Sequence, residues 1–330
     1  MSDFVTLADI EGAAERIRGR VLRTPMTRSD ILSDRFGVPV HLKLEHYQTT
    51  GAFKLRGATN ALLRLSPDER ARGVVAASTG NHGRALAYAA AAQGVRAVIC
   101  MSRLVPRNKL DAIERLGAEI RIVGSSQDDA QGEVDRLVAE DGLVMLPPFD
   151  HADIIAGQGT IGLEMAEDVP DVALALIQLS GGGLAAGIAA AIKAKRPRAR
   201  VIGVSMRRGA AMATSLDAGR PVAVEELPTL ADSLGGGIGL ANRYTFPMIR
   251  DLLDGVVLLD EAEIAEGIRH AYAQEREIVE GGGAVGIAAL LAGKVTPDGP
   301  TVLLLSGRNI DMDLHRRIVA GGQSGPDEDA

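Results

Sequence analysis

Mostly apolar runs of four to six residues recur along this chain and alternate with segments of helical length. Such runs are typical of strands that are buried on both faces of a sheet. Between them, residues 83–93 and 184–195 are rich in alanine, and residues 107–116 carry apolar side chains at helical spacing. This alternation predicts an α/β fold made of open, mainly parallel sheets. The expected strands are Val40–Leu44, Gly73–Ala77, Ala97–Cys100, Leu174–Leu179, Val201–Val204 and Thr301–Leu305.

The strand–helix units fall into two sets, and a chain of 330 residues is long enough to form two domains. We expect one domain to comprise residues 1–50 and 151–330 and the other to comprise residues 51–150. The chain would cross between them near Pro147 and Pro148, because neither proline suits the interior of a helix.

The composition argues against several classes of partner. The formal net charge is -7 and aromatic residues make up only 3% of the chain, which disfavours binding to the phosphates or the bases of a nucleic acid. No apolar stretch approaches the roughly 20 residues that span a bilayer, and the first residues lack the pattern of a signal peptide. Cys100 is the one cysteine, and no histidine pair has helical metal-ligand spacing, so we expect no metal site. We therefore expect a cytoplasmic protein that binds neither nucleic acid nor membrane.

The first candidate functional residue is Lys54. It follows Phe53 and is framed by small residues in the segment Thr49–Ala58. A helix starting here would place the amine at the mouth of a pocket, with Phe53 beside it. Taken alone, Lys54 would be a solvated surface lysine.

A glycine loop, Ser180-Gly181-Gly182-Gly183-Leu184, lies between the expected strand Leu174–Leu179 and an alanine-rich segment. Glycines let the backbone approach an anion closely, and the free amides at the start of a helix point toward it. The loop therefore predicts a phosphate site, and the alternative is a tight turn without a ligand.

Two further polar corners follow expected strands. The segment Ser78–Gly83 either caps the next helix or holds a substrate carboxylate, with Asn81 donating to a ring oxygen of a cofactor. His82 alone would most often be a structural histidine. Ser306, after the strand Thr301–Leu305, would by default cap the next turn. A nucleophilic amine, a polar loop and a phosphate cradle together suggest pyridoxal phosphate as the cofactor.

The segment Gly157–Gly162 matches the dinucleotide-binding pattern GxGxxG, but we reject that interpretation. The preceding residues Ala152–Ala156 have the character of a helix rather than of a strand. No acidic residue stands about 20 residues further on, where one would hold a ribose.

Taken together, these motifs resemble the fold-type II pyridoxal-phosphate enzymes, and most closely the threonine dehydratase and serine racemase branch. The resemblance extends from about Ile10 to Ile318, and the motifs occur in the family's order at similar spacing. Within this branch, the segments Glu45–Gly51 and Leu230–Gly237 are similar to those of the hydroxyectoine-utilisation dehydratases.

The resemblance implies which residues hold the cofactor, pyridoxal 5′-phosphate. Lys54 would form the Schiff base, and Phe53 would pack near the cofactor ring. Asn81 would hydrogen-bond the ring hydroxyl, and Ser306 would meet the pyridine nitrogen. The phosphate would lie on the glycine loop, at Ser180, Gly181, Gly182, Gly183 and Leu184.

The resemblance also implies a substrate site and an assembly. Ser78, Thr79 and His82 would line the pocket for the substrate carboxylate, and Thr79 stands where serine racemases have a second acid/base. Residues 1–50 and 151–330 would form the large cofactor-binding domain, and residues 51–150 the small substrate-gating domain. The assembly would be a homodimer or a higher homo-oligomer.

The implied reaction is a β-elimination. Lys54, once freed, would take the Cα proton of a 3-hydroxy amino acid, a general-base contribution typically worth about 10²–10⁴-fold. Loss of the β-hydroxyl would then give a 2-keto acid and ammonia. Serine, threonine and a hydroxyectoine-derived acid are all candidate substrates.

The chain departs from the family pattern at several positions. Ser180 replaces the first glycine of the usual loop, and its amide can still bind a phosphate. Ser205 and Ala211 stand where metal-activated relatives carry carboxylates, so we expect no divalent metal at that site. Ser233 replaces a glycine after Asp232, and Gly281 replaces a proline after Glu280, which suggests that the choice of substrate differs from plain threonine.

Three alternatives remain open from the sequence. An amino-acid racemase would use the same cofactor and the same lysine. A β-replacement synthase is disfavoured because that branch lacks an equivalent of His82. A nucleotide- or cofactor-binding module without activity would explain the glycines but would leave Lys54, Asn81 and Ser306 as coincidences.

Overall fold

The computed structural model describes residues 4–78, 80–103, 107–125 and 127–321. Its strands are β1 Met26–Ser29, β2 Val40–Lys43, β3 Val74–Ala77, β4 Ala97–Met101, β5 Glu119–Ile122, β6 Val144–Met145, β7 Leu174–Gln178, β8 Arg200–Met206, β9 Gly255–Leu259 and β10 Thr301–Leu304. Its α-helices are α1 Leu7–Ile17, α2 Asp30–Phe36, α3 Lys54–Arg64, α4 Pro67–Arg72, α5 Asn81–Ala92, α6 Arg107–Glu114, α7 Gln127–Asp141, α8 Ala152–Asp168, α9 Gly183–Lys195, α10 Ala211–Asp217, α11 Thr245–Leu252, α12 Glu261–Ala273, α13 Gly281–Leu291 and α14 Met312–Val319. Two short 3-10 helices are η1 Glu45–Tyr47 and η2 Asp232–Leu234.

The larger sheet is built from strands of both halves of the chain. In the described part it has six strands, in the order β1-β2-β10-β7-β8-β9. All neighbours are parallel except β1 and β2, which form an antiparallel edge pair. The strand β10 lies between β2 and β7, so that Thr301 is opposite Val40 on one side and Leu174 on the other. The N-terminal segment is thereby joined to the C-terminal half of the chain.

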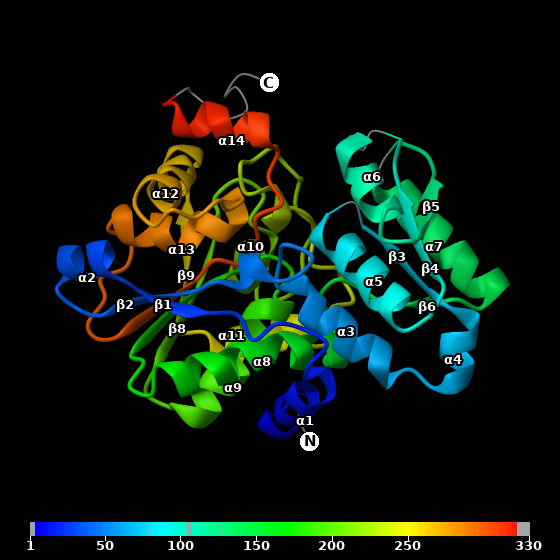
Figure 1. Cartoon of the computed structure of the whole chain (residues 1–330), viewed down its shortest axis with the longest axis horizontal. Coiled ribbons are helices and arrows are strands. Elements are labelled where there is room, and N and C mark those ends of the chain that lie inside the picture. The colour runs from blue at the N-terminus through cyan, green and yellow to red at the C-terminus, as the bar shows by residue number, and fades with distance from the viewer. Residues whose placement is uncertain (1–3, 79, 104–106, 126, 322–330) are drawn as a thin grey trace.

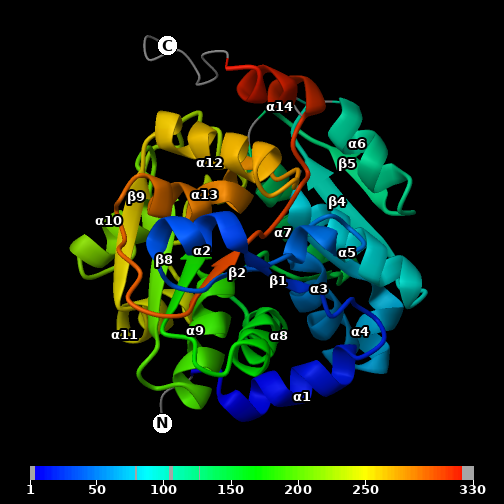
Figure 2. The same cartoon turned by 60° about the vertical axis from the view of Figure 1, so that its left-hand side comes forward.

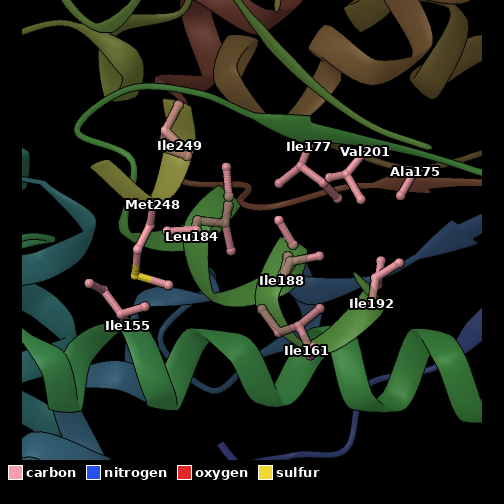
Figure 3. Close-up of a cluster of buried hydrophobic side chains, with 14 of the residues drawn as sticks. Ile155, Ile161, Ala175, Ile177, Leu184, Ile188, Ile192, Val201, Met248 and Ile249 are labelled. Atoms are coloured by element: carbon pink, nitrogen blue, oxygen red, sulfur yellow. The ribbon is translucent and has the colours of Figure 1, made fainter. Parts of the chain in front are cut away.

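Helices cover both faces of this sheet. Figures 1 and 2 show α12 and α13 on one face and α8 and α9 on the other. Along β7, Leu174 and Leu176 belong to the core beneath α13, whereas Ala175 and Ile177 belong to the core beneath α9. Figure 3 shows Ile177 among apolar side chains from α8, α9 and α11. The strand is apolar at consecutive positions because both of its faces are buried.

The smaller sheet has the order β5-β4-β3-β6, and its neighbours are parallel. It lies on the right-hand side of Figure 1. Ala76 and Ile99 face a core shared with α3, α5 and α6, whereas Val75 and Val98 face a core shared with α7. Each face of this sheet is therefore also covered.

The GxGxxG segment lies within helix α8. It is therefore not a loop between a strand and a helix, as a dinucleotide-binding segment would be. Its glycines allow close helix crossings. A Cβ atom on Gly157 would lie 2.6 Å from the Cα atom of Gly57 in α3, and one on Gly159 would lie 2.9 Å from the carbonyl oxygen of Gly187 in α9. Glycine is required here because the backbones approach more closely than a side chain would allow.

The predicted fold class is confirmed, and every expected strand is present within two residues at either end. Four strands were not predicted: β1, β5, β6 and β9. All four lie at sheet edges, where one flank is open and the side chains are partly exposed. They therefore lack the continuous apolar character from which the inner strands are recognisable.

The topology directs three polar loops toward one place. The loops that begin at Ser78, Ser180 and Ser306 follow the carboxyl ends of β3, β7 and β10. Ligands of open parallel sheets bind at the carboxyl ends of the strands. Among the described residues, none of the helices combines the length and the apolar character that crossing a bilayer requires.

Candidate active site

A cavity of about 450 Å³ brings the predicted site residues together. Its walls include every described member of the predicted set: Phe53, Lys54, Ser78, Asn81, His82, Ser180, Gly181, Gly182, Gly183, Leu184 and Ser306. Thr79 lies outside the described residues. A second cavity of about 830 Å³ shares Arg84, Asp232 and Asn309 with the first, but neither Lys54 nor the glycine loop lines it. The smaller cavity is therefore the candidate active site.

Lys54 is placed by the backbone that precedes it. The amide of Phe53 donates to the carbonyl oxygen of Ser306 at 3.0 Å, and Ala52 pairs with Gly307 in an isolated antiparallel bridge. Helix α3 then begins at Lys54, whose Nζ atom donates to the carbonyl oxygen of Pro148 at 2.7 Å. The amine lies 5.2 Å from the centre of the Phe53 ring.

The environment of Lys54 makes its amine easier to deprotonate. Burial lowers the pKa of Lys54 to about 8, and the negative charge of Glu280 partly opposes this effect. At neutral and mildly alkaline pH, a substantial fraction of the amine is therefore neutral. A neutral amine is a nucleophile and a base.

The glycine loop admits no side chains at its three glycines. A Cβ atom on Gly181 would lie 2.4 Å from the Phe149 ring, and one on Gly183 would lie 2.8 Å from the carbonyl oxygen of Phe149. Gly182 has φ +92°, a conformation that favours glycine. Among the described residues, no side chain caps helix α9 at this end. The amides at the start of α9 are thus left to an anion, which fits a phosphate group.

Ser78 and His82 already have partners within the protein. The Ser78 hydroxyl oxygen accepts a hydrogen bond from the amide of Gly83 at 3.1 Å, which leaves its proton to donate. The Nε2 atom of His82 lies 2.8 Å from the carbonyl oxygen of Leu146 and must donate to it, because a carbonyl only accepts. Burial, with a smaller contribution from Lys54, lowers the pKa of His82 to about 4. His82 is therefore neutral at physiological pH.

Ser306 and Gln178 present polar groups to the cavity. Ser306 is buried, and no described side chain contacts its hydroxyl through a hydrogen bond. The Nε2 atom of Gln178 donates to the carbonyl oxygen of Leu304 at 2.6 Å, whereas its Oε1 atom is buried and has no partner among the described residues. A polar ligand that supplies a donor would satisfy this oxygen. The cavity volume, the open amides and this orphan oxygen together fit pyridoxal phosphate.

Sequence reasoning missed Phe149, Gln178 and Asn309 in the cavity wall, and it named Glu280 only as the residue before the altered Gly281. Phe149 supports the glycine loop, and Gln178 is the polar residue at the end of the apolar run of β7. Glu280 and Asn309 contact Asn81 directly. Polarity inside a buried strand would have indicated Gln178, but nothing local in the sequence places Glu280 beside Asn81, because they are 199 residues apart.

Comparison with known proteins gives the same assignment. Residues 17–307 match the family model described as "Pyridoxal-phosphate dependent enzyme". A protein of Sinorhizobium fredii called "Putative threonine dehydratase" is 65% identical over 326 residues, which cover 98% of each chain.

Two solved structures are also similar. Maize serine racemase has a TM-score of 0.89 and 32% identity, over 94% of this chain and 95% of that one. A threonine deaminase from the organism abbreviated T.th. has a TM-score of 0.86 and 36% identity, over 93% of this chain and 99% of that one. The chain therefore belongs to the fold-type II pyridoxal-phosphate-dependent enzymes, in the threonine dehydratase family.

Proposed function

We propose that this protein is a pyridoxal-phosphate-dependent ammonia-lyase that converts a 3-hydroxy amino acid such as threonine into a 2-keto acid and ammonia. The observation that carries the proposal is the position of Lys54. Its amine, with a pKa lowered to about 8, lines the same cavity as the uncapped start of helix α9. A nucleophilic amine and a phosphate site within one cavity are what this cofactor requires.

The protein would hold the cofactor at five places. Lys54 would bind it covalently, and the amides from Ser180 to Leu184 would bind its phosphate. Asn81 would donate to its ring hydroxyl, and Ser306 would face its ring nitrogen. Phe53 would pack near the ring. A hydroxyl at Ser306, unlike a carboxylate, does not hold a proton on the nitrogen.

The chemistry divides between cofactor and protein. When bound, the cofactor supplies an electron sink for the negative charge that develops at Cα. Lys54 would remove the Cα proton as a general base, for which its lowered pKa suits it. The walls of the cavity would hold the β-hydroxyl where it can leave.

The substrate would be recognised at the start of helix α5. Ser78, Thr79 and His82 would line the pocket for its carboxylate, with the Ser78 hydroxyl as a donor. His82 would shape this pocket without donating to the carboxylate, because its one N–H binds the carbonyl oxygen of Leu146. The segment Asp232–Gly237 lines the cavity and belongs to the run that resembles the hydroxyectoine-utilisation dehydratases. A hydroxyectoine-derived 3-hydroxy amino acid is therefore a second proposed substrate.

We also propose an organisation around this site. Residues 51–150 would form a small domain that closes over the substrate, and residues 1–50 and 151–330 would form the large domain that holds the cofactor. The enzyme would act in the cytoplasm as a homodimer or a higher homo-oligomer.

The experiment that tests the function is an assay of keto-acid release by the purified holoprotein. L-threonine, L-serine and a hydroxyectoine-derived 3-hydroxy amino acid form the panel. We expect turnover of at least one substrate, and a loss of about 10²–10⁴-fold or more in kcat/KM for Lys54→Ala. Lys195→Ala, an exposed lysine that pairs with Glu11, is the matched control. Equal activity of wild type and Lys54→Ala would overturn the proposal.

A racemase is the second candidate, favoured by the similarity to maize serine racemase. Recovered substrate from the same assay distinguishes the two activities. Racemisation would place the opposite enantiomer in the unreacted pool, whereas elimination alone would leave its configuration intact.

A further inference from the structure

A buried carboxylate stands behind Asn81. Glu280 occupies the N-cap position of helix α13, but its side chain does not cap that helix. Instead, its Oε1 atom accepts a hydrogen bond from Nδ2 of Asn81 at 2.8 Å, and its Oε2 atom accepts one from the amide of Asn309 at 3.0 Å. Only 4% of Glu280 is exposed. Burying a carboxylate this deeply is costly unless hydrogen bonds offset the loss of water.

Asn309 holds the other end of the Asn81 amide. Its Nδ2 atom donates to Oδ1 of Asn81 at 2.6 Å and to the carbonyl oxygen of Thr50 at 3.0 Å. Its Oδ1 atom accepts a hydrogen bond from Nη1 of Arg84 at 2.8 Å. The four side chains thus form one chain of hydrogen bonds, in the order Arg84, Asn309, Asn81, Glu280.

The two ends of this chain determine the orientation of both amides. An arginine only donates and an ionised carboxylate only accepts, whereas an asparagine amide can otherwise be turned by 180°. Arg84 therefore requires the oxygen of Asn309 on its side, and Glu280 requires the NH₂ group of Asn81 on its side. Asn81 then keeps one N–H for the cavity that it lines. This proton is the donor that a ring hydroxyl oxygen would need.

Ser233, a residue at which this chain departs from the family pattern, lies near Glu280. It stands in η2, where the family pattern has a glycine, and its hydroxyl is close enough to Glu280 to lower the pKa of that carboxyl. A Cβ atom on Gly282 would lie 2.3 Å from the Ser233 hydroxyl oxygen, and one on Gly281 would lie 2.0 Å from the carbonyl oxygen of Leu230. The two departures from the family pattern, Ser233 and Gly281, therefore both lie where the segment Leu230–Leu234 packs against the start of α13.

The charges around Glu280 influence whether its carboxyl group is protonated. Burial and the charge of Asp232 raise the pKa of Glu280 to about 7, against the opposing hydrogen bonds from Ser233, Asn81 and Asn309. Lys54 on α3 and Arg84 on α5 also face it. Loss of the Ser233 hydroxyl would favour the protonated form, and a protonated Glu280 no longer requires the NH₂ group of Asn81 on its side.

We propose that Glu280 and Ser233 are positioning residues, which act through Asn81 to keep its N–H directed at the ring hydroxyl of the bound cofactor. The proposal rests on the proposed function. In this proposal Ser233, which replaces a glycine and lies against the first turn of α13, supports Glu280 from the side of η2.

The test compares holoenzymes of wild type, Glu280→Gln, Ser233→Ala and Ser233→Thr. The measurements are the visible spectrum of the bound cofactor across pH, together with kcat and KM for L-threonine. Glu280→Gln keeps the side-chain volume, but its NH₂ group would face one of the two donors, Asn81 Nδ2 or the Asn309 amide. We therefore expect an altered spectrum and a fall in kcat of about tenfold or more, with a smaller change in KM. Ser233→Ala should move the pH at which the spectrum changes to a higher value, because Glu280 then protonates more readily. Ser233→Thr should restore the wild-type behaviour.

The controls separate this inference from the proposed function. Glu277→Gln removes a nearby carboxylate that binds His46 and Tyr47 and not Asn81, and it should leave the spectrum unchanged. A wild-type protein without cofactor or turnover would contradict the proposed function itself. A different outcome is an active wild type, with Glu280→Gln and Ser233→Ala showing the same spectrum, pH dependence and kcat as the wild type. That result would overturn only the positioning role. Ser233 is exposed, so Ser233→Ala provides this answer even if Glu280→Gln does not fold.

Discussion

The Nζ atom of Lys54 donates a 2.7 Å hydrogen bond to the carbonyl oxygen of Pro148, 94 residues further along the chain. Pro148 precedes Phe149, whose ring lies beneath Gly181 in the phosphate loop. The segment Pro148–Phe149 therefore contacts both Lys54 and the phosphate loop. These two features would hold the aldehyde end and the phosphate end of the cofactor. The site depends on this segment although it contributes no reactive group of its own.

The lowered pKa of Lys54 predicts how fast the apoprotein binds its cofactor. Only the neutral amine attacks a carbonyl, so the rate should rise with pH and level off above about pH 8. Glu280 raises the pKa of Lys54, and Glu280→Gln should therefore move the midpoint to lower pH. Stopped-flow absorbance after mixing apoprotein with pyridoxal phosphate measures this rate. A rate that is independent of pH around 8 would contradict the assignment.

Gly182→Ala should weaken cofactor binding. Gly182 has φ +92°, and an added Cβ atom would lie 2.9 Å from Met212. An L-residue in this region costs about 1–2 kcal/mol, which corresponds to roughly tenfold in the dissociation constant when it disturbs the bound loop. Titration of apoprotein with cofactor provides the measurement. Gly12→Ala, whose Cβ atom would lie 3.7 Å from Arg16, should bind as wild type does.

Arg56→Met should destabilise the fold strongly. Arg56 is 1% exposed, and its guanidinium binds Glu45 at 2.7 Å and Glu164 at 2.6 Å, which leaves two carboxylates without this partner in the variant. Removal of one member of a buried ion pair costs about 3–5 kcal/mol. The control Arg316→Met removes an exposed partner of Asp313 and should change the free energy of unfolding by less than about 1 kcal/mol. Denaturant unfolding measures the free energy of unfolding of both variants. Equally small losses of this free energy would contradict the stabilising role of the buried ion pairs.

His82 should make the protein sensitive to acid. Its pKa is about 4 in the fold, against 6.5 for the unfolded chain, so the unfolded chain binds more protons between these values. The contribution of His82 is complete above pH 6.5 and is lost as the pH falls toward 4, by up to about 3 kcal/mol. His82→Gln should therefore lose less stability than wild type over this interval in chemical denaturation experiments. A parallel decline of the two proteins would show that His82 does not carry the effect.

The sequence contains most of the site but little of its geometry. The glycine loop and Ser78–Gly83 are recognisable because each follows a buried strand, and a local pattern is sufficient to find them. The contact of Phe53 with Ser306 joins segments that are far apart in sequence, and it exists because β10 lies between β2 and β7. Strand order of this kind depends on the packing of the whole sheet, so no local pattern predicts it.

Glu280 illustrates the same limit at the level of one residue. It stands at the N-cap position of helix α13, where a side chain ordinarily binds its own helix. In the fold it faces Asn81 instead. The edge strands β1, β5, β6 and β9 were missed for the opposite reason, because their partial exposure removes the apolar pattern that identifies inner strands.

The role of Lys54 is tested most directly by locating the cofactor on the chain. Borohydride reduction of the holoprotein would fix the covalent link, and proteolysis with mass spectrometry would then identify the modified lysine. We expect a single pyridoxyl group on the peptide that contains Lys54, absent when the apoprotein is treated in the same way. A label on another lysine, or none after incubation with excess cofactor, would contradict the assignment of Lys54 as the lysine that binds the cofactor.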